Sequence, residues 1–234
     1  MRNRYLFIAL QRDFDNFSIE DAIQFEYQEL FFNHIQFDRT NTAKLVDLFE
    51  ILPVERVEFI ECEFIDNKTS DFSKSRSLAK VKLSKCNGHS SFALSCLTNP
   101  HLQELIMIAA DDERYLRSMK SILPNNLTSM ADALEHHYSL SAFSFDDIET
   151  YLSSNAGIRN LSRMRNMVAD ASQRINTYIE RNKRGRQRCR DVIYTLFLIK
   201  YYSSNNVFRL MDKHVLMVIA RHLYASIGTK PWCE

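Results

Sequence analysis

Apolar residues recur along this chain in a fixed local pattern, at relative positions 1, 4 and 6 of a short segment. Leu102, Leu105 and Met107 show it, directly after a helix-forming segment that ends near Asn99. An apolar residue at every second position is typical of a strand with one buried face. The segment therefore predicts a helix, a helix stop and a short strand, in that order, over residues 93–107.

The same pattern occurs at four further places, which indicates a repeat. First core residues lie at positions 32, 54, 78 and 102, and the last copy starts 38 residues after position 102. We interpret the extra length as an inserted helix over about residues 112–123, ended by Pro124. The core positions are Phe32, Ile35 and Phe37; Val54, Val57 and Phe59; Leu78, Val81 and Leu83; Leu102, Leu105 and Met107; and Leu140, Phe143 and Phe145.

The first four starts are 22 to 24 residues apart, a period typical of leucine-rich repeats. Residues 30–165 resemble the ribonuclease-inhibitor-like class of these proteins. The resemblance implies an α/β solenoid, with short parallel strands on a concave face and helices on the convex face. Ordinary amphipathic segments of an α+β domain would give the same spacing, but the recurring order of helix, stop and strand favours the repeats. The position after each strand that usually carries a polar ladder residue is irregular, since it holds Thr40, Cys62, Cys86 and Ala110. A weaker last copy runs through Leu152, Asn155, Ile158 and Leu161.

Two segments outside the repeats complete the predicted architecture. Residues 5–10 form a first strand that covers the open end of the stack. Three helices are expected after the repeats, over about 156–182, 186–203 and 212–227, with Gly185 as a helix stop. We expect a repeat domain over residues 1–165 and a C-terminal helical cap or appendage over residues 166–234, since an open solenoid must cover its last apolar layer.

In this architecture the residues between the core positions face a partner, so the sequence predicts a protein-interaction module. Ile60, Ile106 and Ile108 lie centrally among charged residues, and aliphatic contact with charged pairs around it suits a protein partner. We interpret the chain as a binder and not an enzyme, with no cofactor and no metal. The predicted concave face comprises Arg56, Glu58, Ile60, Lys80, Lys82, Ser84, Glu104, Ile106, Ile108, Ala142, Ser144 and Asp146.

A basic segment supports a different hypothesis. Residues 159–190 carry ten Lys or Arg and only two acids, a local charge of about +8 in a chain whose net charge is +1. Such a segment can bind an anionic membrane surface, nucleic acid or an acidic protein, and it can equally be a solvated turn between helices. Its densest part holds Arg181, Lys183, Arg184, Arg186, Arg188 and Arg190.

Composition and motifs restrict the remaining classes. The five cysteines show no CxxC or zinc-ligand spacing, which favours reduced thiols, and no apolar run is long enough to span a membrane. Nucleotide-binding, metalloprotease and hydrolase motifs are absent. His136 and His137 are adjacent and point apart on a helix, and Cys86 is expected to be buried and inert.

The final helix carries one more resemblance. The segment Val218–Tyr224, followed by Lys230, Pro231 and Trp232, is similar to tail helices of repeat-containing effectors that Legionella injects into host cells. Together with the repeats it implies a secreted leucine-rich-repeat effector that acts in the host cytosol and binds a host protein.

Overall fold

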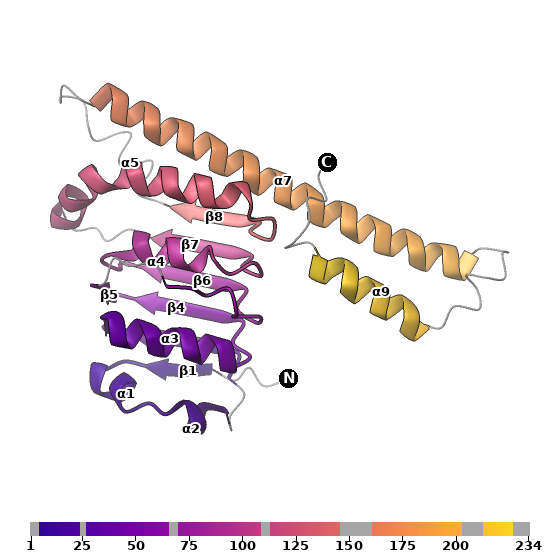
Figure 1. The fold of residues 1–234 in the computed structure, drawn as a ribbon, viewed down its shortest axis with the longest axis horizontal. Coiled ribbons are helices and arrows are strands. Elements are labelled where there is room, and N and C mark those ends of the chain that lie inside the picture. The colour runs from indigo at the N-terminus through magenta and orange to yellow at the C-terminus, as the bar shows by residue number, and fades with distance from the viewer. Residues whose placement is uncertain are drawn as a thin grey trace.

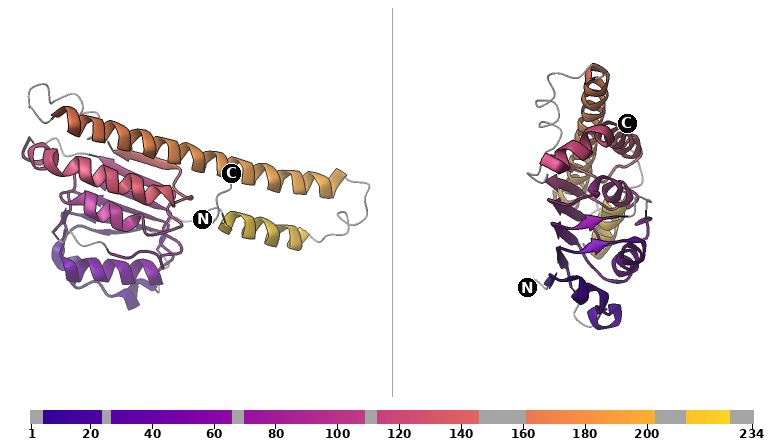
Figure 2. Two further views of the ribbon diagram at one scale, coloured as in Figure 1. Left: turned by 45° about the horizontal axis from the view of Figure 1, so that its top comes forward. Right: turned by 90° about the vertical axis from the view of Figure 1, so that its left-hand side faces the viewer.

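The computed structural model describes residues 5–23, 27–65, 70–108, 113–145, 161–202 and 213–226. Six strands form one parallel sheet, in which each strand lies beside its predecessor in chain order. Helices cover one face of this sheet, and a long helix crosses its last edge and extends far beyond it (Figure 1; Figure 2). The strands are β1 (Tyr5–Ile8), β2 (Glu29–Asn33), β4 (Arg56–Ile60), β6 (Lys80–Ser84), β7 (Glu104–Ile108) and β8 (Ala142–Phe145).

The sheet confirms four of the predicted strand copies and shows that the first was assigned to the wrong residues. Phe32 pairs with Phe59, not with Val54, so the first copy begins five residues earlier, at Tyr27. Its core residues are Tyr27, Leu30 and Phe32. The chain matches the 1, 4 and 6 spacing in both frames because Phe32 is followed by apolar residues at 35 and 37.

The chain leaves three successive strands through the same turn. His34, Glu61 and Lys85 follow the strand ends of β2, β4 and β6, and all three have φ between 51° and 56°. Each donates its backbone N–H to the strand-end carbonyl of the next strand, so the parallel ladder continues past the strand ends. This shared left-handed residue redirects the chain toward the helical side after each of these three strands.

Past this turn lies a smaller parallel pair, β3 (Gln36–Phe37) and β5 (Glu63–Phe64). The register places Cys62 and Cys86 at the ladder position as predicted, but the first member is Ile35 and not Thr40. The Cys86 thiol donates to the Phe59 carbonyl at 3.4 Å. Gly88 follows with φ 67°, and a Cβ there would lie 2.1 Å from the Phe64 carbonyl oxygen, so only glycine fits.

Phenylalanines in edge-to-face and stacked contacts fill the core between the sheet and its helices. Phe59 lies at the centre, with ring centroids 5.1 to 5.4 Å from those of four other phenylalanines. Aromatic pairs at such distances are favourable beyond the area they bury. The four neighbours are Phe32, Phe37, Phe64 and Phe92.

The helical side differs from prediction at Pro124, which lies inside one continuous helix and does not end it. The proline removes one backbone donor, but the following turns bury Leu127, Met130, Ala131 and Leu134, and this packing offsets the loss. The described helices before residue 140 are α1 (Gln11–Asp15), α2 (Ile19–Ile23), α3 (Arg39–Ile51), α4 (His89–Cys96) and α5 (Glu113–Glu135).

The C-terminal region also differs, because two of the three predicted helices are a single one. Helix α7 (Leu161–Tyr202) has 42 residues and continues through Gly185. A mid-helix glycine costs about 1 kcal/mol relative to alanine, and buried residues on both sides of it, Ile179 and Cys189, outweigh this cost. The third predicted helix is confirmed as α9 (Lys213–Ser226).

The first half of α7 packs on α5 and closes the core, so the boundary expected at residue 165 lies inside this helix. No helix among the described residues is long and apolar enough to cross a membrane. The described residues do not include the weak last copy at Leu152, Asn155 and Ile158, nor the ladder residue Ala110, nor Asp146 of the predicted binding face.

Candidate functional site

The face of the sheet opposite the helices is an ordered array of side chains, which we call the open face. Strand residues alternate between the core and this face. Because the strands are in register, the outward residues form rows across the sheet. The first row is Tyr5, Glu29, Arg56, Lys80, Glu104 and Ala142; the second is Phe7, Phe31, Glu58, Lys82, Ile106 and Ser144; the third is Asn33, Ile60, Ser84 and Ile108.

All the described residues of the predicted binding face lie in these rows. Leu105 and Met107, which flank Ile106 in the chain, are fully buried, whereas Ile106 and Ile108 are only partly covered. The aliphatic side chains at 60, 106 and 108 therefore are not core residues. They are available at a surface that no described helix covers.

Charged side chains on the open face pair with one another. Glu58 is only 8% exposed and accepts a hydrogen bond from Lys82 at 2.7 Å; Arg56 lies 3.4 Å from its other oxygen. Lys80 and Glu104 form a further ion pair at 3.4 Å. With Glu29 the face carries three cations and three anions, so it has no net charge.

Aromatic residues at the β1 edge extend the face and were not predicted. Tyr5 and Phe7 are more than half exposed, and the Tyr5 ring meets Phe31 edge to face at 6.3 Å. The incorrect frame of the first copy concealed Phe31, because it placed that strand around Ile35, whereas the strand at residues 5–10 was predicted only as a cover for the open end of the stack. The pattern from Tyr27 to Phe32 was the signal that could have found the second strand.

At the opposite edge, α7 forms a wall beside the open face. A cleft of about 500 Å³ lies between β8 and this helix. Ile106 and Ala142 line it from the sheet, and Ile179, Glu180 and Lys183 line it from α7. The cleft joins Ile106, on the strand next to the edge, to a polar surface of α7.

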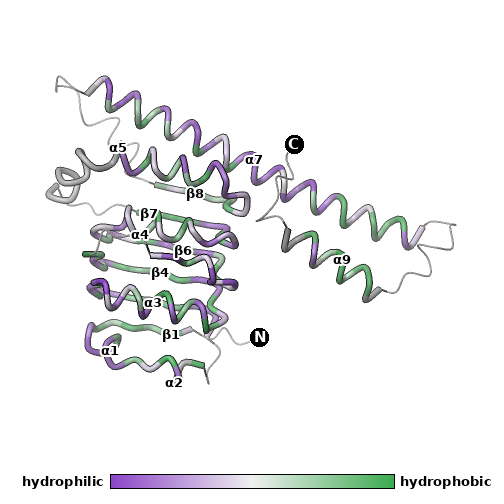
Figure 3. Tube along the Cα trace, in the orientation of Figure 1, coloured by the Kyte–Doolittle hydropathy of each residue, from purple (hydrophilic) through white to green (hydrophobic). Residues whose placement is uncertain are grey.

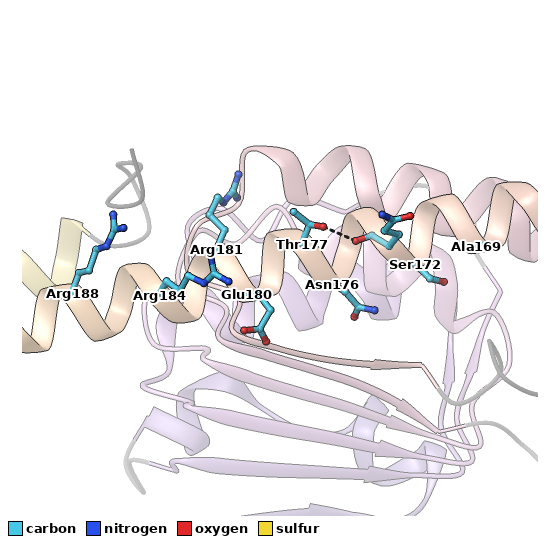
Figure 4. A pocket seen from close by; sticks show the side chains of 9 residues that line it. Ala169, Ser172, Asn176, Thr177, Glu180, Arg181, Arg184 and Arg188 are labelled. Atoms are coloured by element: carbon cyan, nitrogen blue, oxygen red, sulfur yellow. Dashed lines mark hydrogen bonds between the residues drawn. The ribbon is translucent and has the colours of Figure 1, made fainter.

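The basic segment predicted as an alternative site is helical, and part of it has a structural role. Arg181 donates to the carbonyl oxygens of Leu134 and Glu135 at 3.2 and 2.9 Å, where α5 ends. A cation at this position complements the negative end of the helix dipole. Its guanidinium also stacks 4.3 Å from the centroid of the Tyr138 ring, and Figure 4 shows it pointing toward the α5 end.

Two neighbours of Arg181 complete the attachment of α7. Asn182 is buried and donates to the carbonyl oxygens of His137 and Leu140 at 2.8 and 2.7 Å. Arg186 donates to Ser139 at 2.7 Å. Lys183 instead pairs with Glu180 at 2.7 Å, and Arg184, Arg188 and Arg190 are exposed.

This attachment gives a stability prediction for Asn182→Ala. The change removes two hydrogen bonds to buried carbonyls and should lower the free energy of unfolding by about 2 kcal/mol. His137 keeps a second donor from Arg181 at 3.3 Å, which limits the loss. Urea denaturation measures it, with exposed Asn176→Ala on the same helix as the control. Equal stability of the two variants would contradict the role of Asn182.

The other candidate chemistry is structural. Interaction with the neighbouring Cys62 thiol, together with burial, raises the pKa of Cys86, which disfavours its thiolate form. His136 is exposed, whereas His137 is buried and hydrogen-bonded to the Asn99 carbonyl at 2.8 Å. Across the ranges that the structure describes, no group of three His, Cys, Asp or Glu side chains could hold a metal ion.

A second groove, of about 770 Å³, follows α7 and shares Asn176 and Glu180 with the cleft against β8. The side chains that line it come from residues 169–188 of that helix, and Figure 4 shows how they point in different directions from it.

Comparisons with protein-family models, with curated proteins and with solved structures find no match to this chain.

Proposed function

We propose that the chain is a protein-interaction module that binds a partner through the open face. The observation that carries this proposal is a register-aligned surface on which an aliphatic patch, formed by Ile60, Ile106 and Ile108, lies beside the ion-paired charges of the central strands. The aliphatic patch offers apolar contact to a partner, and the ion pairs beside it hold the surrounding charges in fixed positions. Its zero net charge disfavours nucleic acid, whose binding depends on neutralising phosphates.

We further propose that the parallel sheet and its helices are a leucine-rich-repeat solenoid capped by α7. Strand order that follows chain order supports this, as do the shared left-handed turn and the cysteine ladder. In such solenoids each repeat contacts only its neighbours, and the strand face is the usual binding surface. A secreted effector that meets its partner in a host cytosol is the setting this proposal favours.

The test is affinity capture from eukaryotic cell lysate with wild-type protein and the double variant Ile106→Asp/Ile108→Asp. Two carboxylates in the aliphatic patch should abolish capture of a discrete partner, because their desolvation is uncompensated. Both side chains lie outside the core, so the thermal midpoint should change by only a few degrees.

The matched control is Ile51→Asp/Ile65→Asp. These two isoleucines are each about half exposed and lie outside the rows of the open face. The control should retain the partner. Capture that survives the open-face variant, or that both variants lose equally, would contradict binding through this face.

A further inference from the structure

The second half of α7 and α9 form a projection that we call the terminal hairpin, consisting of residues 187–202 and 213–226. The two helices lie side by side beyond the edge of the sheet in both Figure 1 and Figure 2. The main core ends at Ile179, before the hairpin begins. The hairpin thus packs largely on itself.

The hairpin is apolar on its outer side as well as between its helices. Tyr194, Tyr201 and Tyr202 are 65 to 83% exposed, and Leu198 is more than a third exposed. Arg190, Tyr194, Leu198 and Tyr201 follow each other at helical spacing and form one stripe. On α9, Val215, Met217 and Val218 are similarly exposed, and Figure 3 shows the apolar character of both helices.

A water-exposed helix is normally polar on its outer side. Residues 191–202 contain only three residues that are neither aliphatic nor aromatic, namely Asp191, Thr195 and Lys200. Of the hairpin's inward residues, Cys189 and Leu216 are buried, whereas Phe197 is only partly buried. Two helices alone cannot cover this much apolar surface, so a further surface is needed to cover it.

Charge indicates what that surface is. The hairpin carries five Lys or Arg and a single acid, Asp191, and Arg184 lies just before it on α7. Two copies of such a hairpin would repel each other, whereas an anionic surface would attract it. Exposed aliphatic and tyrosine side chains next to arginines are typical of helices that lie in a membrane interface.

We propose that the terminal hairpin binds the surface of an anionic membrane. Its exposed apolar side chains enter the boundary between lipid head groups and acyl chains, and Arg184, Arg188 and Arg190 remain among the lipid phosphates. The apolar part of α7, residues 191–202, is about 18 Å long, which suits a peripheral position and is too short to span a bilayer. This inference is independent of the function proposed for the open face.

The experiment measures partitioning of the full chain onto vesicles of phosphatidylcholine alone and vesicles with about one third phosphatidylserine. We expect at least about tenfold tighter binding to the acidic vesicles at low ionic strength. The double variant Tyr194→Asp/Leu198→Asp should weaken that binding by a further factor of about ten or more relative to a charge-matched control.

The control is Gln173→Asp/Thr177→Asp, which adds the same charge on exposed polar positions of the same helix before the terminal hairpin begins. Equal binding by the two variants would show that charge alone acts and would overturn insertion. Absence of wild-type binding to acidic vesicles would overturn the proposal outright. A dimer that only Tyr194→Asp/Leu198→Asp disrupts, without vesicle binding, would assign the surface to a second copy.

Discussion

Replacing Phe59 by alanine is expected to lower the free energy of unfolding by about 3–5 kcal/mol. The ring is fully buried and touches phenylalanines from the neighbouring strand, the small second sheet and α4. Because these contacts join elements on both sides of the core, the cavity cannot close by moving one side chain. Protein interiors are packed at crystal-like density, so the lost contacts are not replaced and the free energy of unfolding falls.

Urea denaturation of wild-type protein and Phe59→Ala measures this effect. The control is Phe31→Ala, because Phe31 is the same residue type on an adjacent strand but lies on the open face. We expect the control to cost less than about 1 kcal/mol. Similar losses for both variants would contradict the assignment of the two faces.

Acidification is expected to destabilise the protein through His89. Burial lowers the pKa of His89 to about 4, although its hydrogen bond to the Cys86 carbonyl raises it in part. Above pH 6.5 the ring is neutral in both the folded and the unfolded state. Between pH 6.5 and 4 the unfolded state takes up a proton that the folded state excludes, so stability falls by about 1.4 kcal/mol per pH unit, about 3 kcal/mol in total.

The measurement compares the free energy of unfolding at pH 7.5 and pH 4.5 for wild-type protein and His89→Asn. The variant cannot titrate at this position, so the drop should be smaller by about 3 kcal/mol. Burial also lowers the pKa of His137, which adds to the drop in both proteins and leaves the difference unchanged. An identical drop in both would contradict a neutral, buried His89.

The repeat pattern predicted the strands β4, β6, β7 and β8, because each has one face in the core and alternation survives in the sequence. It misplaced β2 because two apolar residues after that strand, Ile35 and Phe37, enter the core at the small second sheet. Proline and glycine were misleading for a physical reason. Pro124 and Gly185 lower local helix stability, but tertiary packing along α5 and α7 outweighs single-residue preferences.

The candidate site was predictable where it follows from strand alternation and not where it depends on tertiary placement. The isoleucines of the open face were identified from their positions between core residues. The wall that α7 forms, including Lys183, and the structural role of Arg181 could not be derived, since both depend on where the helix docks. Ten basic residues in sequence indicate charge but do not distinguish a helix attachment from a ligand site.

Helix α7 also sets a fixed separation between the two proposed binding surfaces. At 1.5 Å per residue its 42 residues extend about 63 Å, and the Arg181, Asn182 and Arg186 attachment fixes its direction relative to the sheet. Whatever binds the open face is therefore held at a set distance and angle from whatever binds the far end. A flexible linker of the same residue count would let that separation fluctuate, whereas here one continuous helix restricts the two events to a single relative geometry.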